Sequence, residues 1–135
     1  MTRSRAEKSL RWLLTLMGAT AVLAFVAVVM PTDWMESAND FLGLGPFPQA
    51  PLTQYLTRSL SALYGCLGLL IIYLGFNVRR YLDLIIVVAW LIMLLGVLLT
   101  GIDFKSGMPA SWAWGEGPPT VVLGAAFLWL ARKAG

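Results

Sequence analysis

Apolar residues gather in four long stretches of the chain, and short segments rich in charged or turn-forming residues separate them. A helix needs about 20 apolar residues to cross a bilayer, because it rises about 1.5 Å per residue and the hydrocarbon core is about 30 Å thick. The pattern predicts an all-α polytopic membrane protein whose four transmembrane helices form a bundle and a single domain, residues 1–135. The expected spans are residues 10–30, 54–76, 82–102 and 117–132.

The segment between the first two spans predicts a short helix of its own. After Pro31, two acidic residues stand three positions apart, a spacing typical of a helix start, and Gly43 marks a stop. We therefore expect a short interfacial amphipathic helix in the first outer loop. The residues expected to share its apolar face are Trp34, Ala38, Phe41 and Leu42.

The basic residues are unevenly placed along the chain. Eight of the ten Lys and Arg residues lie in the N-terminal leader, in the turn at Arg79 and Arg80, and in the tail at Arg132 and Lys133. Four spans put these three segments on one side of the membrane, and basic residues mark cytoplasmic loops. We therefore expect a multi-pass protein of the bacterial inner membrane with both termini in the cytoplasm. The net charge of +3 then reflects orientation, and no nucleic-acid partner is expected.

The composition excludes several kinds of chemistry. Hydrophobic residues make up 59% of the chain and charged residues only 13%, whereas soluble domains carry about 25% charged residues. The chain has no histidine and a single cysteine, Cys66. It therefore lacks the usual general base, the commonest metal ligand and any intramolecular disulfide or thiolate metal cage. We expect no enzymatic activity, no bound metal and no cofactor.

Arg58 is the most informative polar residue, because it lies about one turn inside the second span, where a charge is costly. By membrane depth, its nearest acidic candidates are Asp103 at the end of the third span and Glu116 before the fourth. Asp33 is a further candidate. One hypothesis is an outer-leaflet cluster of Arg58, Asp103 and Glu116, joined by Tyr55. The alternative is an arginine that extends its guanidinium to the water interface without a partner.

Two tryptophans lie near the same membrane depth. Trp112 and Trp114 belong to the second outer loop, which we expect to run over residues 104–119. Indole rings collect at the membrane–water interface, so both are expected to anchor the loop at headgroup depth, beside the predicted outer site.

Small residues follow one face of the second span. Steps of three and four positions keep residues on the same side of a helix, and small side chains there let two helix backbones approach closely. We expect close packing along this face, either within the bundle or against a second copy of the chain. The residues are Ser61, Gly65, Gly68 and Gly75.

Three segments carry a resemblance to a known group of proteins. They are the run Pro51–Tyr64, the turn Arg79–Tyr81 and the entry to the fourth span at Gly115–Pro118. They resemble a group of uncharacterised small bacterial inner-membrane proteins with four helices, and the resemblance extends over nearly the whole chain. It implies a fold but no known activity. Similarity to the DoxX-like membrane proteins is weaker, because it rests on span number and size, and it transfers no residue roles.

These observations support one leading functional hypothesis and one alternative. The leading hypothesis is a non-enzymatic membrane protein that binds a lipid, a quinone-like hydrophobe or a membrane partner at its outer-leaflet face. Membrane lipids, and a second copy of the chain or another membrane protein, are the expected partners. The alternative is a small oligomeric transporter or channel with a polar outer vestibule. The expected site residues are Arg58, Asp103, Glu116, Tyr55, Trp112 and Trp114.

Overall fold

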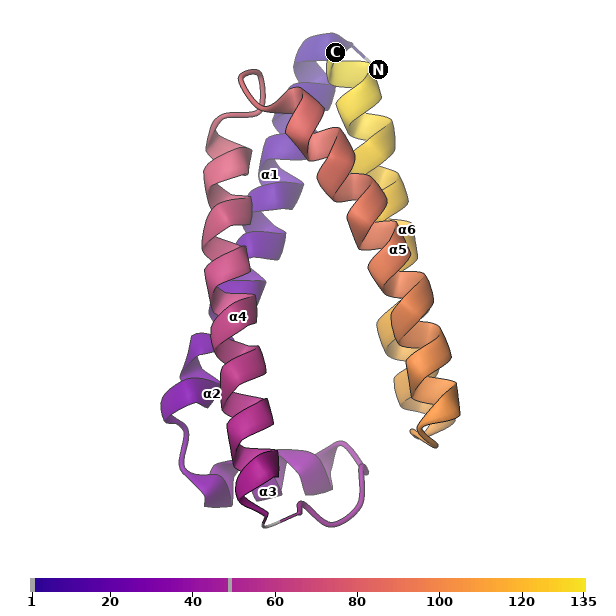
Figure 1. The fold of residues 1–135 in the computed structure, drawn as a ribbon. Coiled ribbons are helices and arrows are strands. Elements are labelled where there is room, and N and C mark those ends of the chain that lie inside the picture. The colour runs from indigo at the N-terminus through magenta and orange to yellow at the C-terminus, as the bar shows by residue number, and fades with distance from the viewer. Residues whose placement is uncertain (1, 49) are drawn as a thin grey trace. The chain divides into compact units, whose positions relative to one another are not determined.

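The computed structural model describes residues 2–48 and 50–135, and these residues fold into six α-helices joined by turns and loops (Figure 1). The described residues contain no β-strand, so the all-α prediction is confirmed. The helices are α1 (Arg3–Val22), α2 (Phe25–Val29), α3 (Thr32–Phe41), α4 (Pro51–Phe76), α5 (Leu82–Lys105) and α6 (Ala110–Ala134).

Three helical stretches in the described part of the chain are long and apolar enough to cross a membrane. They are Arg3–Val29, which comprises α1 and α2, then α4 and α5. α6 has 25 residues, which is sufficient in length, but its first half contains Glu116, two prolines and two glycines that lower its hydropathy. The first three expected spans therefore coincide with apolar helices. The fourth span stays a prediction.

The first apolar stretch is divided into two helices. α1 ends at Val22 and α2 begins at Phe25, with a turn between them. At this turn the amide of Ala24 donates to the carbonyl of Ala21 at 3.0 Å, and the amide of Ala27 donates to the carbonyl of Ala24 at 3.0 Å. These bonds reach back three residues and tighten the backbone relative to an α-helix. The apolar pattern carries no sign of the break, because the turn contains neither glycine nor proline.

The short helix expected between the first two spans is present as α3. It begins directly after Pro31 and ends at Phe41, and Gly43 follows with a φ of 69°. Only glycine adopts such a left-handed conformation at little cost, so it ends the helix as the sequence predicts. Met35 is buried on one side of α3, while Phe41 is 90% exposed.

The connection between α5 and α6 is much shorter than the sequence suggests. We expected a loop over residues 104–119, but α5 continues to Lys105 and α6 begins at Ala110. Residues 106–109 form the turn, in which Gly107 has a φ of 76°. The prediction began the fourth span at residue 117, because the charge-free stretch starts directly after Glu116. Instead Pro118 and Pro119 lie inside α6, so Trp112, Trp114 and Glu116 are helical.

The chain forms two compact units. The terminal unit comprises the residues up to Leu13 together with Leu74–Gly135, and the middle unit is Leu14–Tyr73. In the middle unit, a Cβ placed on Gly68 would lie 2.7 Å from the carbonyl oxygen of Gly18. A Cβ on Gly65 would lie 2.5 Å from the ring of Phe25. The close packing expected at these two glycines is therefore confirmed within this unit.

In the terminal unit, α5 and α6 run side by side and pack through small residues (Figure 1). A Cβ on Gly96 would lie 2.8 Å from the carbonyl oxygen of Gly117, and one on Gly124 would lie 2.9 Å from that of Ala89. Phe127 is fully buried in this unit. The helix pair has two polar ends. One is the α5–α6 turn, and the other is the terminal end, where the start of α1 lies beside the end of α6 (Figure 1).

Candidate functional site

Arg58, in the middle unit, is held by two carbonyl oxygens and one side chain. Its Nη1 donates to the carbonyl oxygen of Val28 at 2.8 Å and to that of Ala27 at 3.3 Å. Its Nε and Nη2 donate to Oε1 of Gln54 at 3.4 and 3.2 Å. Gln54 in turn donates from Nε2 to Oγ1 of Thr32 at 2.8 Å. Arg58 therefore belongs to a hydrogen-bonded chain that joins α4 to the end of α2 and the start of α3.

These contacts explain how an apolar helix accommodates a cation. The last carbonyls of a helix have no partner within the helix and carry partial negative charge. α2 ends at Val29, and Arg58 supplies donors to two of its last carbonyls. Tyr55, on the same helix, is 65% exposed. The contacts of Arg58 are thus those of a helix cap. Its predicted cluster with Asp103 and Glu116 would join the two units and stays a prediction.

Asp103 and Glu116 interact in the terminal unit, beside the α5–α6 turn. Asp103 lies in the last turn of α5 and is only 5% exposed, and its Oδ2 is buried without a hydrogen-bond partner among the described residues. Glu116 lies half-buried on α6. Its burial, the charge of Asp103 and a hydrogen bond with that carboxyl group raise the pKa of Glu116, while a hydrogen bond from Trp112 opposes the rise.

This carboxyl pair is electrostatically uncompensated. Two neighbouring carboxylates repel each other, and a buried one also loses its hydration. Such a pair lowers its energy by sharing a proton or by binding a group that brings positive charge or hydrogen-bond donors. Among the described residues, no group of three or more His, Cys, Asp or Glu side chains is placed to hold a metal ion. A donor group or a proton therefore suits the pair.

A shallow hollow gives access to Glu116. Its volume is about 260 Å³, and Ser111, Trp112 and Gly115 line it with Glu116. A Cβ on Gly115 would meet no atom within 4 Å, so the surface is open at that point. The indole of Trp112 is half-buried and donates to the Glu116 carboxyl group. The structure therefore brings together Asp103, Glu116 and Trp112 from the predicted set.

Trp114 has a different neighbour. Its ring meets the ring of Phe104 edge-on, with the centroids 5.7 Å apart, and both side chains are exposed. The pair joins the last turn of α5 to the first turns of α6. Edge-to-face pairs of this kind add about 0.5–1.5 kcal/mol beyond the area they bury. Trp114 thus stabilises the α5–α6 turn, whereas Trp112 lines the hollow.

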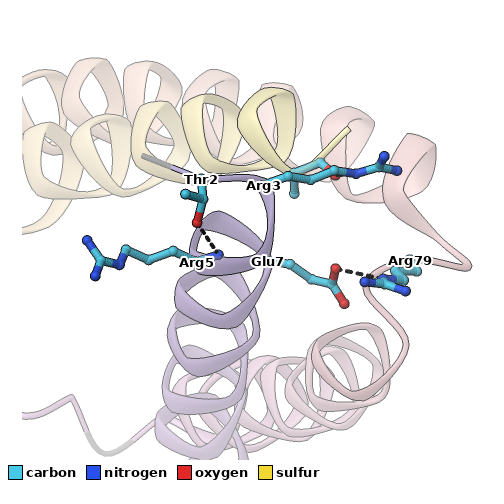
Figure 2. A network of polar contacts seen from close by, with 6 residues as sticks. Thr2, Arg3, Arg5, Glu7 and Arg79 are labelled. Carbon is cyan, nitrogen blue, oxygen red and sulfur yellow. Dashed lines mark hydrogen bonds and ion pairs between the residues drawn. The ribbon is translucent and has the colours of Figure 1, made fainter.

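The terminal end of the same unit carries an ion pair that sequence reasoning missed. Nε of Arg79 lies 2.7 Å from Oε2 of Glu7, and Nε of Arg3 donates to the carbonyl of Ala134 at 3.0 Å. Figure 2 shows Arg3, Glu7 and Arg79 close together at the start of α1 and the turn after α4. By sequence, Asp83 can pair locally with either Arg79 or Arg80. The signal for the true partner is that Glu7 is the only acidic residue in the basic leader.

Two cations at this end also contact aromatic rings. The guanidinium carbon of Arg11 lies 5.4 Å from the ring centroid of Phe76, and that of Arg80 lies 5.2 Å from the ring of Tyr81. Such cation–π contacts contribute about 0.5–1 kcal/mol at exposed sites. They hold two arginines close to apolar surface.

Comparison with family models, with curated proteins and with solved structures found no match to this chain. The resemblance to small four-helix inner-membrane proteins therefore stays a prediction. What the chain does has to follow from its own residues.

Proposed function

We propose that this chain is a non-enzymatic four-span protein of the bacterial inner membrane that binds a lipid at its outer face. Both termini lie in the cytoplasm in this proposal, and the α5–α6 turn lies at the outer face. The lipid carries a headgroup with hydrogen-bond donors, and Asp103 and Glu116 receive that headgroup.

The charges of the terminal unit support this orientation. Arg3 and Arg79 lie at its terminal end, where Arg132 and Lys133 form the last turn of α6. Asp103 and Glu116 lie at the other end of the α5–α6 pair. Because basic residues favour the cytoplasmic side, the terminal end belongs there. α6 packs along an apolar helix and has the length to cross with it, which favours a fourth span.

The observation that carries the proposal is the buried, unpartnered oxygen of Asp103. An uncompensated carboxylate next to a second carboxyl group is costly, and acids in such surroundings mark candidate functional sites. A headgroup ammonium brings both a positive charge and three N–H donors. Phosphatidylethanolamine has such a group, whereas the quaternary ammonium of phosphatidylcholine has no N–H. The pair therefore favours an amine-bearing lipid.

The remaining residues of the predicted set fit around this site in different ways. Trp112 borders the hollow and orients Glu116, and it is suited to the headgroup region where indole rings collect. In this proposal Arg58 acts mainly as the cap of α2. The transporter alternative needs a polar path, and α5 is apolar from Leu84 to Leu99. We therefore favour binding over transport.

Lipid retention tests the proposal. The full chain is extracted in a mild detergent, exposed to equal amounts of phosphatidylethanolamine and phosphatidylcholine, and examined by native mass spectrometry. We expect the wild type to retain phosphatidylethanolamine preferentially, because only that headgroup donates hydrogen bonds. We expect Asp103→Asn and Glu116→Gln to lose the preference. Equal retention of both lipids by the wild type would overturn the proposal.

Two further variants serve as controls. Asp83→Asn removes an exposed carboxylate at the opposite end of α5 and should leave the preference unchanged. Arg58→Gln weakens the cap of α2, so we expect lower stability with the lipid preference retained. A loss of the preference in Arg58→Gln would instead support the three-residue cluster of Arg58, Asp103 and Glu116.

A further inference from the structure

The terminal end of the terminal unit holds two hollows that no part of the proposed outer site uses. One has a volume of about 360 Å³ and the other about 260 Å³. Their linings share Ser4, Glu7, Val78 and Arg79, so the two hollows adjoin. They are formed by the start of α1, the end of α4 and the turn after it, the start of α5 and the end of α6.

The charge of these hollows is strongly positive. Arg3 and Arg79 line the first hollow, and Lys8, Arg11 and Arg79 line the second. Glu7 is the only acidic residue in either lining. It is engaged by Nε of Arg79 at 2.7 Å, so it fixes one cation in place. The linings therefore present three cations in excess of their acid.

The arginines keep donors for a ligand. Arg79 uses its Nε toward Glu7 (Figure 2). Arg3 uses its Nε toward the carbonyl of Ala134. A guanidinium has five N–H donors, and four of them belong to the two terminal nitrogens. Phosphate oxygens match this fork, because the group accepts paired hydrogen bonds from arginine. The Arg79 side chain is 79% exposed, so a phosphate can reach it.

Apolar surface lies directly beside the cations. Phe76 lines the second hollow, is 58% exposed, and has the guanidinium of Arg11 over its ring. Val78 is buried in both linings, and Leu82 borders the first hollow. A free phosphate would gain nothing from this surface. A phospholipid would set its phosphate among the cations and its acyl chains against Phe76.

We propose that the hollows formed by Arg3, Lys8, Arg11 and Arg79 bind the phosphate headgroup of an anionic phospholipid. Basic pockets at the ends of membrane helices bind such headgroups on the cytoplasmic side. This site differs in charge and place from the carboxyl pair at the α5–α6 turn, and it does not depend on that pair being occupied.

A competition between two lipids tests this proposal. The full chain in mild detergent is titrated with phosphatidylglycerol and with phosphatidylcholine of the same acyl chains, and native mass spectrometry counts the lipids retained. We expect preference for phosphatidylglycerol in the wild type. Arg79→Gln should weaken its binding about fivefold, since one basic residue near a membrane surface accounts for a factor of this order. Equal binding of both lipids would overturn the proposal.

A matched control separates a built site from diffuse charge. Arg132→Gln removes the same charge at the same end, but Arg132 lines neither hollow. Lys8→Gln removes a lining cation that is exposed, so it tests the site without disturbing the ion pair of Arg79. We expect Lys8→Gln to weaken binding and Arg132→Gln to leave it unchanged. Equal losses in the two variants would overturn the site.

A last experiment distinguishes a phospholipid from a soluble phosphate compound as the ligand of the hollows. Soluble glycerol phosphate, added in excess over the bound phosphatidylglycerol, offers the same charged group without acyl chains. We expect it to leave the lipid bound, because it cannot contact Phe76. Displacement of the lipid by glycerol phosphate would assign the hollows to a soluble phosphate and overturn the lipid proposal.

Discussion

The two ends of the terminal unit carry opposite kinds of charged side chains in different surroundings. At the terminal end, cations outnumber the single acid Glu7, which forms an ion pair with the exposed Arg79. At the α5–α6 turn, the carboxyl groups of Asp103 and Glu116 interact with each other, and one oxygen of Asp103 is buried without a partner. At the terminal end the acid is thus paired with a cation and open to water, whereas at the α5–α6 turn the acids have no cationic partner and are partly buried.

The difference shows where the structure stores unfavourable energy. An exposed ion pair contributes little because water screens it, and it constrains function little. A buried like-charge pair costs stability, and it persists only where something else relieves it. Uncompensated groups of this kind are therefore better pointers to a ligand than paired ones. By the same argument, the terminal end points to a ligand only through its excess of cations, because its acid is already paired.

The largest expected effect on stability comes from forcing apart α5 and α6, the helix pair that connects the two ends of the terminal unit. In Gly117→Ala, the new Cβ would lie 2.8 Å from the carbonyl oxygen of Gly96, where backbone cannot yield. We expect a loss of about 2–3 kcal/mol of stability, as overpacking typically costs. Thermal unfolding of the purified chain in detergent measures it.

Gly115→Ala is the matched control, two residues away on the same helix. Its Cβ would meet no atom within 4 Å, so only the backbone effect remains. Replacing an exposed helical glycine by alanine gains about 0.5–1 kcal/mol. If Gly117→Ala stabilised the chain as Gly115→Ala does, the close approach of α5 and α6 at Gly117 would be disproved.

The second effect contrasts the two acidic residues of α5. Asp103→Asn removes a buried charge from the C-terminal end of the helix, where the helix dipole also disfavours it, so we expect a gain of about 1–2 kcal/mol without ligand. Asp83→Asn removes an exposed charge from the first turn, where the dipole favours it, and should cost about 0.3–1 kcal/mol. Unfolding of both variants after removal of lipid measures these two changes in stability, which should have opposite signs. A destabilised Asp103→Asn would mean that its carboxylate already has a partner.

Much of this fold could be predicted because apolar periodicity and turn chemistry are local properties. The three apolar spans and the short helix α3 follow from stretches free of charge and from Gly43. The break after Val22 could not be predicted, because no residue there opposes a helix. The start of α6 was misplaced because the expected span began only after the charged Glu116, whereas the helix begins at Ala110 and packs along α5.

The site was predictable only in part, because membrane depth does not specify neighbours. Depth proposed Asp103 and Glu116 as partners of Arg58, and in the structure the two acids interact with each other across one short turn. It did not predict the contacts of Arg58 with α2, which depend on the unforeseen helix end at Val29. It also missed the pairing of Glu7 with Arg79, which lie 72 positions apart in sequence.

The smallest effect is a pH dependence confined to the α5–α6 turn. Burial and the charge of Asp103 raise the pKa of Glu116 above its ordinary value of 4.5, so the folded chain binds a proton more readily than the unfolded chain. Stability should therefore rise as the pH falls through the folded-state pKa, and level off below the unfolded one. Glu116→Gln removes this titration. At pH 7 it should be more stable than the wild type, and the difference should shrink as the pH falls.

Melting temperatures of the delipidated wild type and Glu116→Gln, measured from pH 8 to pH 4.5, check this dependence. Parallel curves would mean that Glu116 titrates alike in the folded and unfolded chain, and the two ends would then no longer differ in charge compensation. Added phosphatidylethanolamine sharpens the comparison, because an ammonium group stabilises the charged carboxylate and should reduce the wild-type slope. Phosphatidylglycerol, which we assign to the terminal end, should shift both curves equally and leave their difference unchanged.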